Sequence, residues 1–115
     1  MLIYKIFRDD EWQAFEAAGE TAGAPVDRAD GFIHFSTAAQ VAETAARHFA
    51  GQDGLWLLAC ETDDLGRALR WEVSRGGAEF PHLYRALSLD DVVFARPLPL
   101  GPAGHEFGEL HDDDD

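Results

Sequence analysis

The sequence predicts a single α+β domain, a compact mixed sheet with helices in the first half of the chain. The chain has 115 residues, which is enough for one hydrophobic core. Apolar runs typical of strands occur near both ends, whereas apolar residues at helical spacing occur in the first half. Strands and helices therefore do not alternate regularly, and a doubly wound parallel sheet is not indicated. We assign residues 1–100 to the domain and residues 101–115 to a flexible acidic tail.

The first strand and helix are predicted near the N-terminus. LIYKIF, residues 2–7, is rich in β-forming residues and predicts a strand. Asp9 or Asp10 can then cap a helix. Apolar residues follow at helical spacing, namely Trp12, Phe15 and Ala18. Gly19 ends this predicted helix. TAGAPVDRAD, residues 21–30, is small, polar and interrupted by proline, so a loop is expected there.

A second strand and helix follow. DGFIHFST, residues 30–37, is an apolar run around one histidine and predicts a strand. Ser36 or Thr37 can cap the next helix, with Gln40 in the position that a capping box requires. The apolar stripe of this helix consists of Ala38, Val41, Ala42, Ala45 and Phe49.

The second half of the chain is predicted to contain mainly strands. LWLLAC, residues 55–60, is a continuous apolar run, as expected for a central strand buried on both faces. Thr62 or Asp63 can cap a short helical turn that reaches Ala68. The remaining strands are expected at residues 69–74, 82–87 and 91–98, with a turn at 75–78 and with Pro97 and Pro99 ending the last strand.

Strand alternation suggests a functional cleft. Successive side chains of a strand point to opposite sides, so three of the expected strands present polar groups on one face. The polar groups that share a face are His34 with Ser36, Arg70 with Glu72 and Ser74, and His82 with Tyr84. If the three faces converge, they line a cleft that contains His34, Glu72, His82 and Tyr84.

Purely structural interpretations remain open for the same residues. A strand histidine such as His34 is often a core residue hydrogen-bonded to a carbonyl group. Glu72 can be the solvated face of an edge strand, and Arg47 with His48 can form an ordinary polar helix face. Ser36 favours a binding site, because it shares the face of His34 and precedes a helix whose free N–H groups attract anions.

Several classes of site lack their usual signatures. A zinc site built from His34, His48, His82 and Glu72 is a competing hypothesis, but H-E-x-x-H and paired-cysteine spacings are missing, so no metal is expected. The single cysteine, Cys60, lies in an apolar strand without a cationic neighbour in sequence. The sequence contains no G-x-S-x-G motif, P-loop or G-x-G-x-x-G motif.

Charge and composition restrict the partners. With 22 acidic and 9 basic residues, the formal net charge is −13. Such a charge repels phosphate backbones, so nucleic acid is not expected, whereas a small anion in a local arginine pocket is compatible with it. The unpaired cysteine favours a reducing compartment, and neither a signal peptide nor a long apolar run is found, so we expect a cytoplasmic protein without a membrane span.

Three segments together carry a family resemblance. DGFIHFST (residues 30–37), LRWE (69–72) and FPHLY (80–84), in this order and spacing, resemble the small bacterial family called domain of unknown function 952. The resemblance extends from Tyr4 to about Pro97, with Arg85 standing where glycine is expected. Members of that family resemble the ADP-ribosylation fold, a compact α+β domain in which ADP-ribosyltransferases and tRNA 2′-phosphotransferases bind NAD or an ADP-ribosylated intermediate.

The resemblance implies roles for individual residues. His34 with Ser36 and Thr37 matches the pattern that holds the adenosine-side ribose in those enzymes. Glu72 corresponds by order to the glutamate that contacts the nicotinamide ribose and stabilises an oxocarbenium-like transition state. The catalytic candidates are therefore His34, Glu72 and His82. Further candidates for cofactor contacts are Tyr84 or Trp56 against nicotinamide and Arg47, Arg70 or Arg85 against the pyrophosphate.

Three functions are compatible with these residues. The first is an ADP-ribosyltransferase-like enzyme that acts on NAD or an ADP-ribosyl compound. The second is a non-catalytic module that binds a nucleotide or another small anion through the same side chains. The third is a structural or partner-binding domain in which Trp12, Trp56 and Trp71 belong to the core. The sequence does not decide among them, nor does it determine an acceptor or the oligomeric state.

Overall fold

The computed structural model describes residues 1–112, apart from the side chain of Arg75, and confirms the α+β class. Its α-helices are α1 (Asp9–Ala18), α2 (Pro25–Asp30), α3 (Val41–His48) and α4 (Thr62–Leu65). Its strands are β1 (Leu2–Arg8), β2 (Glu20–Thr21), β3 (Ile33–His34), β4 (Ser36–Thr37), β5 (Leu55–Glu61), β6 (Leu69–Val73), β7 (Glu79–Leu83), β8 (Leu87–Ser88), β9 (Val92–Leu98), β10 (Leu100–Gly101) and β11 (Gly104–His105). Short 3₁₀ turns lie at Gly66–Ala68, Arg75–Gly77 and Leu89–Asp91.

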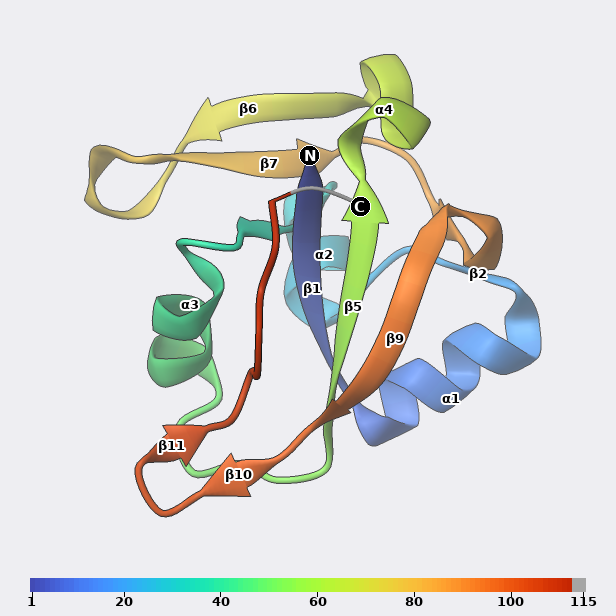
Figure 1. Cartoon of the computed structure of the whole chain (residues 1–115). Helices are drawn as coiled ribbons and strands as arrows, with labels where there is room; N and C mark the ends of the chain where they lie inside the picture. The colour runs from blue at the N-terminus through green and yellow to red at the C-terminus, as the bar shows by residue number, and fades with distance from the viewer. Residues whose placement is uncertain (113–115) are drawn as a thin grey trace.

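Two antiparallel sheets form the framework of the domain. The larger sheet has the strand order β4-β1-β5-β9, and β1 pairs with β5 along its whole length, from Leu2 opposite Glu61 to Arg8 opposite Leu55. The smaller sheet has the order β3-β7-β6, and its β6–β7 hairpin lies across one end of the larger sheet (Figure 1). The prediction of a central strand at residues 55–60 is confirmed, since β5 lies between β1 and β9.

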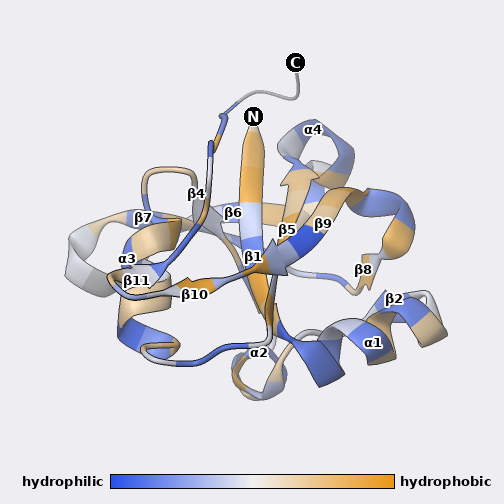
Figure 2. Ribbon diagram, turned by 60° about the horizontal axis from the view of Figure 1, so that its bottom comes forward, coloured by the Kyte–Doolittle hydropathy of each residue, from blue (hydrophilic) through white to orange (hydrophobic). Residues whose placement is uncertain are grey.

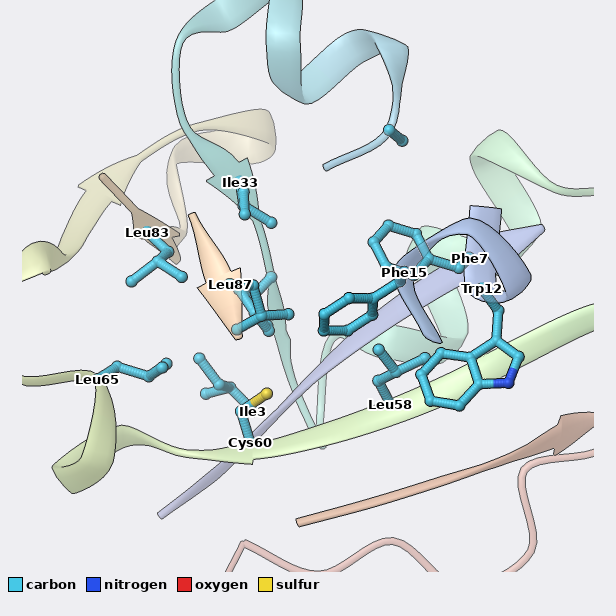
Figure 3. Packing of buried hydrophobic residues seen from close by; sticks show 12 residues of the cluster. Ile3, Phe7, Trp12, Phe15, Ile33, Leu58, Cys60, Leu65, Leu83 and Leu87 are labelled. Atoms are coloured by element: carbon cyan, nitrogen blue, oxygen red, sulfur yellow. The ribbon is translucent and has the colours of Figure 1, made fainter. Parts of the chain in front are cut away.

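Hydrophobic residues cover both faces of the larger sheet. On one face, Ile3 and Leu58 pack with Phe15 of α1 and with Leu83 and Leu87 (Figure 3). On the other face, α3 contributes Val41 and Ala45 to a cluster with alternate residues of β1 and β5. Figure 2 shows the same division, with hydrophobic residues concentrated on the central strands and hydrophilic residues along α1. Strand alternation therefore divides the apolar residues of β1 and β5 between two cores.

The single strand predicted over residues 30–37 is two strands in different sheets. Ile33 and His34 form β3 and pair with β7, whereas Ser36 and Thr37 form β4 and pair with β1. Phe35, between them, still donates its backbone N–H to the Pro81 carbonyl. The chain therefore crosses from one sheet to the other within five residues.

Two predicted boundaries of helices and strands are wrong. The helix expected to be capped by Ser36 or Thr37 begins at Val41, because those two residues are held in the β4 ladder. The strand expected at residues 82–87 begins at Glu79 and ends at Leu83, so it includes Pro81. The strand at 91–98 is confirmed as β9, although it runs through Pro97.

The predicted loop at residues 21–30 contains the helix α2. Pro25 occupies the first helical turn, where its missing N–H costs no hydrogen bond. The Asp27 carboxylate accepts a hydrogen bond from the N–H of Ala24, the residue before the helix, at 2.8 Å. Proline and aspartate, which the sequence analysis read as loop residues, are therefore helix-starting residues here.

The chain after residue 100 returns along the larger sheet. In Figure 1 this segment runs beside β1, and the Tyr4 hydroxyl donates a hydrogen bond to the His111 carbonyl at 2.7 Å. Phe107 and Leu110 pack against the buried cluster on the α3 side. Residues 101–112 of the expected tail thus contact the domain, while residues 113–115 of that prediction lie outside the described residues.

Candidate functional site

A cavity of about 670 Å³ opens beside β1, where the two sheets separate. The paired register of β1 with β4 covers only Ile3 and Tyr4, so the edge of β1 from Lys5 onward faces the cavity instead of a strand. The described residues of the wall are Lys5, Ile6, Arg8, Ala24, Pro25, Val26, His34, Ser36, Val41, Thr44, His48, Phe49, Ser74, Phe80 and His82. Volumes of this size are typical of small-molecule sites.

Asp27 organises the wall of the cavity from behind. The residue is 1% exposed, and its Oδ2 lies 2.7 Å from the Nζ of Lys5. Its Oδ1 accepts hydrogen bonds from the backbone N–H of His34 at 3.0 Å and faces His34 Nδ1 at 2.6 Å. One buried carboxylate therefore positions both a lysine and a histidine.

The pKa values of Asp27 and Lys5 reflect this environment. Burial, the largest single effect, favours the neutral acid, but the hydrogen bonds from His34 and the charge of Lys5 outweigh it and lower the pKa of Asp27. Burial is also the largest effect on Lys5, and it lowers the pKa of the amine despite the attraction of Asp27. The Asp27 contribution to stability is present above the ordinary carboxyl pKa and is lost as the pH falls through the folded-state pKa.

His34 is held through both nitrogens of its ring. Nδ1 faces Asp27 at 2.6 Å, and Nε2 lies 3.0 Å from Oδ2 of Asp30. The Lys5 Nζ also donates to the His34 carbonyl at 3.0 Å. These contacts hold the His34 ring in one orientation in the wall.

His82 belongs to a second hydrogen-bonded group. Its Nδ1 lies 2.8 Å from Oε1 of Glu72, and the Tyr84 hydroxyl donates to the same oxygen at 2.6 Å. Phe32 stacks on the His82 ring with a centroid separation of 4.2 Å. Because Nδ1 is bound to Glu72, Nε2 is the nitrogen that His82 can offer to a ligand. A carboxylate that orients an imidazole in this way is the arrangement of a general base.

The predicted convergence of three polar strand faces is present in the structure. Glu72 and His82 come from β6 and β7, and Tyr84 follows directly after β7. The rings of His34 and His82 lie 5.3 Å apart between centroids. The wall of the cavity includes both histidines but neither Glu72 nor Tyr84, which were predicted to lie in the same cleft. Glu72 contacts His82, and Tyr84 contacts Glu72.

The other predicted contact residues are distributed unevenly. Ser36 lies in the wall, and its hydroxyl is 2.8 Å from that of Thr44. Thr37 instead donates its N–H to the Gln40 side chain. Arg47 is exposed on α3, where it pairs with Glu43 at 3.1 Å.

The remaining arginine and tryptophan candidates have structural contacts. Arg70 lies over the Tyr84 ring, 4.8 Å from its centroid. Arg85 binds Asp91 through two hydrogen bonds of 2.8 and 3.1 Å, which lower the pKa of that carboxyl group. Trp56 stacks on Trp12 at 5.4 Å between centroids and is not a wall residue.

Cys60 does not have the environment of a reactive thiol, and the described residues form no group suited to a metal ion. Burial raises the pKa of the Cys60 thiol to about 12, so the thiolate that a nucleophile requires is scarce. Among residues 1–112, no group of three or more histidine, cysteine or acidic side chains is arranged to hold a metal ion. Within the same residues, no helix combines the length and hydrophobicity needed to cross a membrane.

Trp71, expected in the core under the structural hypothesis, is 39% exposed on β6.

Lys5 and Asp27 are the site residues that the sequence analysis missed. Lys5 was read only as part of a strand, although alternation places it between Ile3 and Phe7 on a face that is otherwise core. That position was an available signal, because a lysine is rarely buried without a partner. Asp27 gave no comparable signal, since its segment looked like a loop.

Replacing Tyr84 by phenylalanine is expected to raise the pKa of Glu72. The Tyr84 hydroxyl is the largest of the effects that hold this pKa below its usual value, followed by the hydrogen bond to His82. Carboxyl ¹³C NMR titration of the wild type and of Tyr84→Phe measures the change. Glu106, an exposed carboxylate of the C-terminal segment, serves as the control, and an unchanged Glu72 titration would contradict the assignment.

Comparison with known proteins places this geometry in context. The model of the family described as Protein of unknown function (DUF952) matches residues 6–95. The chain is similar to the crystal structure of protein CC0527 from Caulobacter crescentus, with 51% identity, 91% of this chain and 92% of that chain covered, and a TM-score of 0.87. The solution NMR structure of CC0527 gives 52% identity, 90% coverage of both chains and a TM-score of 0.81. The search of curated proteins found no match.

Proposed function

This chain belongs to the DUF952 family of proteins of unknown function, and we propose that it binds a small anionic ligand of nucleotide size. The ligand binds in the cavity beside His34 and His82. The proposal is inferred from the side chains of this chain. The observation that carries the proposal is the residue composition of the wall. Basic and imidazole side chains line it, and none of its described residues is acidic, although the chain has 22 acidic and 9 basic residues. The basic and imidazole residues are Lys5, Arg8, His34, His48 and His82.

The rest of the wall suits the two parts of a nucleotide. The hydroxyl groups of Ser36 and Thr44 lie in the same wall as His34 and hydrogen-bond to each other at 2.8 Å, so they add polar surface beside the histidine. Val41, Phe49 and Phe80 supply apolar surface against which a planar ring can pack. A ligand with an anionic end and an apolar ring would therefore match the lining.

ADP-ribosyl chemistry on NAD, with the ADP-ribosylation-like fold that the family resemblance implies, is a second candidate. The hydrogen bond between Glu72 and His82 favours it, because a carboxylate-oriented imidazole can accept a proton from an attacking group. In this arrangement Glu72 acts through His82 and does not touch the sugar itself. Glu72 is then a positioning residue, and His82 is the group that meets the substrate.

Thermal unfolding with inorganic phosphate, AMP, ADP-ribose and NAD tests the binding proposal. A ligand at about 100 times its Kd stabilises the folded state by about 2.7 kcal/mol, so at least one of these probes is expected to raise Tm in a saturable way. His82→Asn is expected to weaken that ligand about tenfold, because the ring nitrogen that His82 offers to a ligand is lost. The matched control is His111→Asn, which removes an exposed imidazole outside the wall. No rise in Tm with any of the four probes at millimolar concentration would contradict the proposal.

Release of nicotinamide from NAD, followed by chromatography, separates the two candidates. Turnover that is lost in Glu72→Gln while ADP-ribose still binds would support ADP-ribosyl chemistry. Binding of ADP-ribose with no release of nicotinamide from the wild type would leave a binding module as the function.

A further inference from the structure

Lys5 is the single lysine of the chain, and it lines the cavity. Its side chain is 7% exposed, and it occupies the face of β1 on which Ile3 and Phe7 belong to the core. A position of this kind normally holds an apolar residue, because burying an ammonium group costs free energy. The placement of the only lysine of the chain in the wall of this cavity therefore suggests a chemical role.

The surroundings of the Lys5 amine suit a nucleophile. Nζ lies 2.7 Å from Asp27 Oδ2, which can take a proton from it, and 3.0 Å from the His34 carbonyl oxygen. An ammonium group has three N–H donors, and these two contacts use two of them. Burial lowers the pKa of Lys5, so the neutral amine is more populated than in an exposed lysine.

We propose that Lys5 forms an imine with the carbonyl group of an anionic aldehyde or ketone bound in the cavity. This inference rests on the proposed function, because the anionic group of the ligand is what the histidines and Arg8 would hold. The lysine supplies the reactive atom, and the neighbouring carboxylate supplies the proton transfers. The ligand class is thereby narrowed to anions that carry a free carbonyl group.

The reaction balances without an oxidant or reductant. The Lys5 ammonium first gives a proton to Asp27, and the free Nζ lone pair attacks the carbonyl carbon. The electron pair of the C=O π bond moves to oxygen, which takes up a proton, while the new ammonium nitrogen loses one. The resulting carbinolamine loses its hydroxyl group as water and its remaining N–H proton, so that a C=N bond replaces the C=O bond.

Labelling with pyridoxal 5′-phosphate, an anionic aldehyde, tests the proposal. Sodium cyanoborohydride converts an imine into a stable secondary amine, and peptide mass spectrometry then locates the group. The chain has two primary amines, Lys5 and the α-amine of Met1, which lies 2.7 Å from Glu61. We expect saturable labelling of Lys5 that inorganic phosphate slows, and labelling of Met1 that phosphate leaves unchanged.

Two controls separate site chemistry from general amine reactivity. Pyridoxal without the phosphate group is expected to label Lys5 about tenfold more slowly, because one charged contact is lost. Lys5→Arg keeps a positive charge but removes the primary amine, so its labelling is expected at Met1 alone. The peptide map of the wild type decides the result even where this buried substitution fails to fold.

Two outcomes overturn the proposal. One is labelling of the wild type at Met1 alone, and the other is labelling of Lys5 only after denaturant has unfolded the chain. If phosphate or AMP raises Tm while Lys5 stays unlabelled, the imine is excluded and the anion-binding function stands. If no anion raises Tm and Lys5 stays unlabelled, both proposals fail.

Discussion

Replacing Asp27 by asparagine is expected to lower the free energy of unfolding by about 3–5 kcal/mol, because it leaves the Lys5 ammonium buried without its counter-charge. Asparagine has nearly the same volume, so the loss reports the charge and its hydrogen bonds rather than a cavity. Lys5 and Asp27 are 7% and 1% exposed, which limits any replacement of the carboxylate by water. Chemical denaturation at neutral pH measures the difference.

The pH dependence and a matched variant sharpen this prediction. Because Asp27 has a lowered pKa, the difference between wild type and variant is expected to shrink as the pH falls below the ordinary carboxyl value of 3.8. Asp30→Asn is the control, since Asp30 contacts the same histidine at 3.0 Å but is about half exposed, and its loss should stay within about 1 kcal/mol. Equal losses in the two variants would contradict the central role of Asp27.

A second substitution tests whether the buried charge is the cause. Adding Lys5→Met to Asp27→Asn removes the unpaired ammonium and fills its place with an apolar side chain of similar length. Recovery of a large part of the lost stability is expected, because buried ion pairs can be replaced by apolar residues at little cost. A double variant that is less stable than Asp27→Asn would assign the loss to the hydrogen bonds at Ala24 and His34 instead.

Replacing Phe15 by alanine is expected to lower the free energy of unfolding by about 3–5 kcal/mol, through lost burial and the cavity left behind. Phe15 is 1% exposed and packs edge-to-face on Phe7 and Trp12, with centroid separations of 6.1 and 5.7 Å (Figure 3). Because α1 joins the larger sheet through these rings, the loss should appear as a lower denaturant midpoint.

The control for Phe15 lies on the opposite face of the same helix. Gln13 is exposed, and its side-chain amide donates a hydrogen bond to the Asp9 carboxylate at 3.0 Å. Gln13→Ala is therefore expected to change the stability by no more than about 0.5 kcal/mol. A Phe15→Ala loss as small as that of Gln13→Ala would show that α1 contributes little to the core.

The cavity depends on a local feature that sequence periodicity does not reveal. Residues 30–37 are predicted as one strand because an apolar run around a single histidine is typical of a strand. In the fold, Ile33 and Ser36 belong to different sheets, and the space between these sheets is the cavity. Which sheet edge a short strand joins is decided by non-local pairing, so no local pattern could have predicted the gap.

Non-local contacts also explain why two site residues, Lys5 and Asp27, were missed. His34, Glu72, His82 and Tyr84 were grouped correctly by alternation, because side chains of a strand keep their sides whatever the strand pairs with. Asp27 was missed because a proline and small polar residues are typical both of loops and of the first turn of a helix. Only the contact of α2 with β3 and the ion pair between Asp27 and Lys5 show which of the two is formed.

By itself, the amino-acid sequence determined the α+β class, the central apolar strand and the set of polar strand residues that approach one another, since these follow from periodicity within short segments. The tertiary structure alone decided that a lysine and an aspartate complete the site, that Arg47 and Arg85 serve other contacts, and that the cavity wall carries no described acidic residue. Such features depend on contacts between segments distant in the chain, and the free energy of those contacts is set by the whole fold rather than by any local stretch.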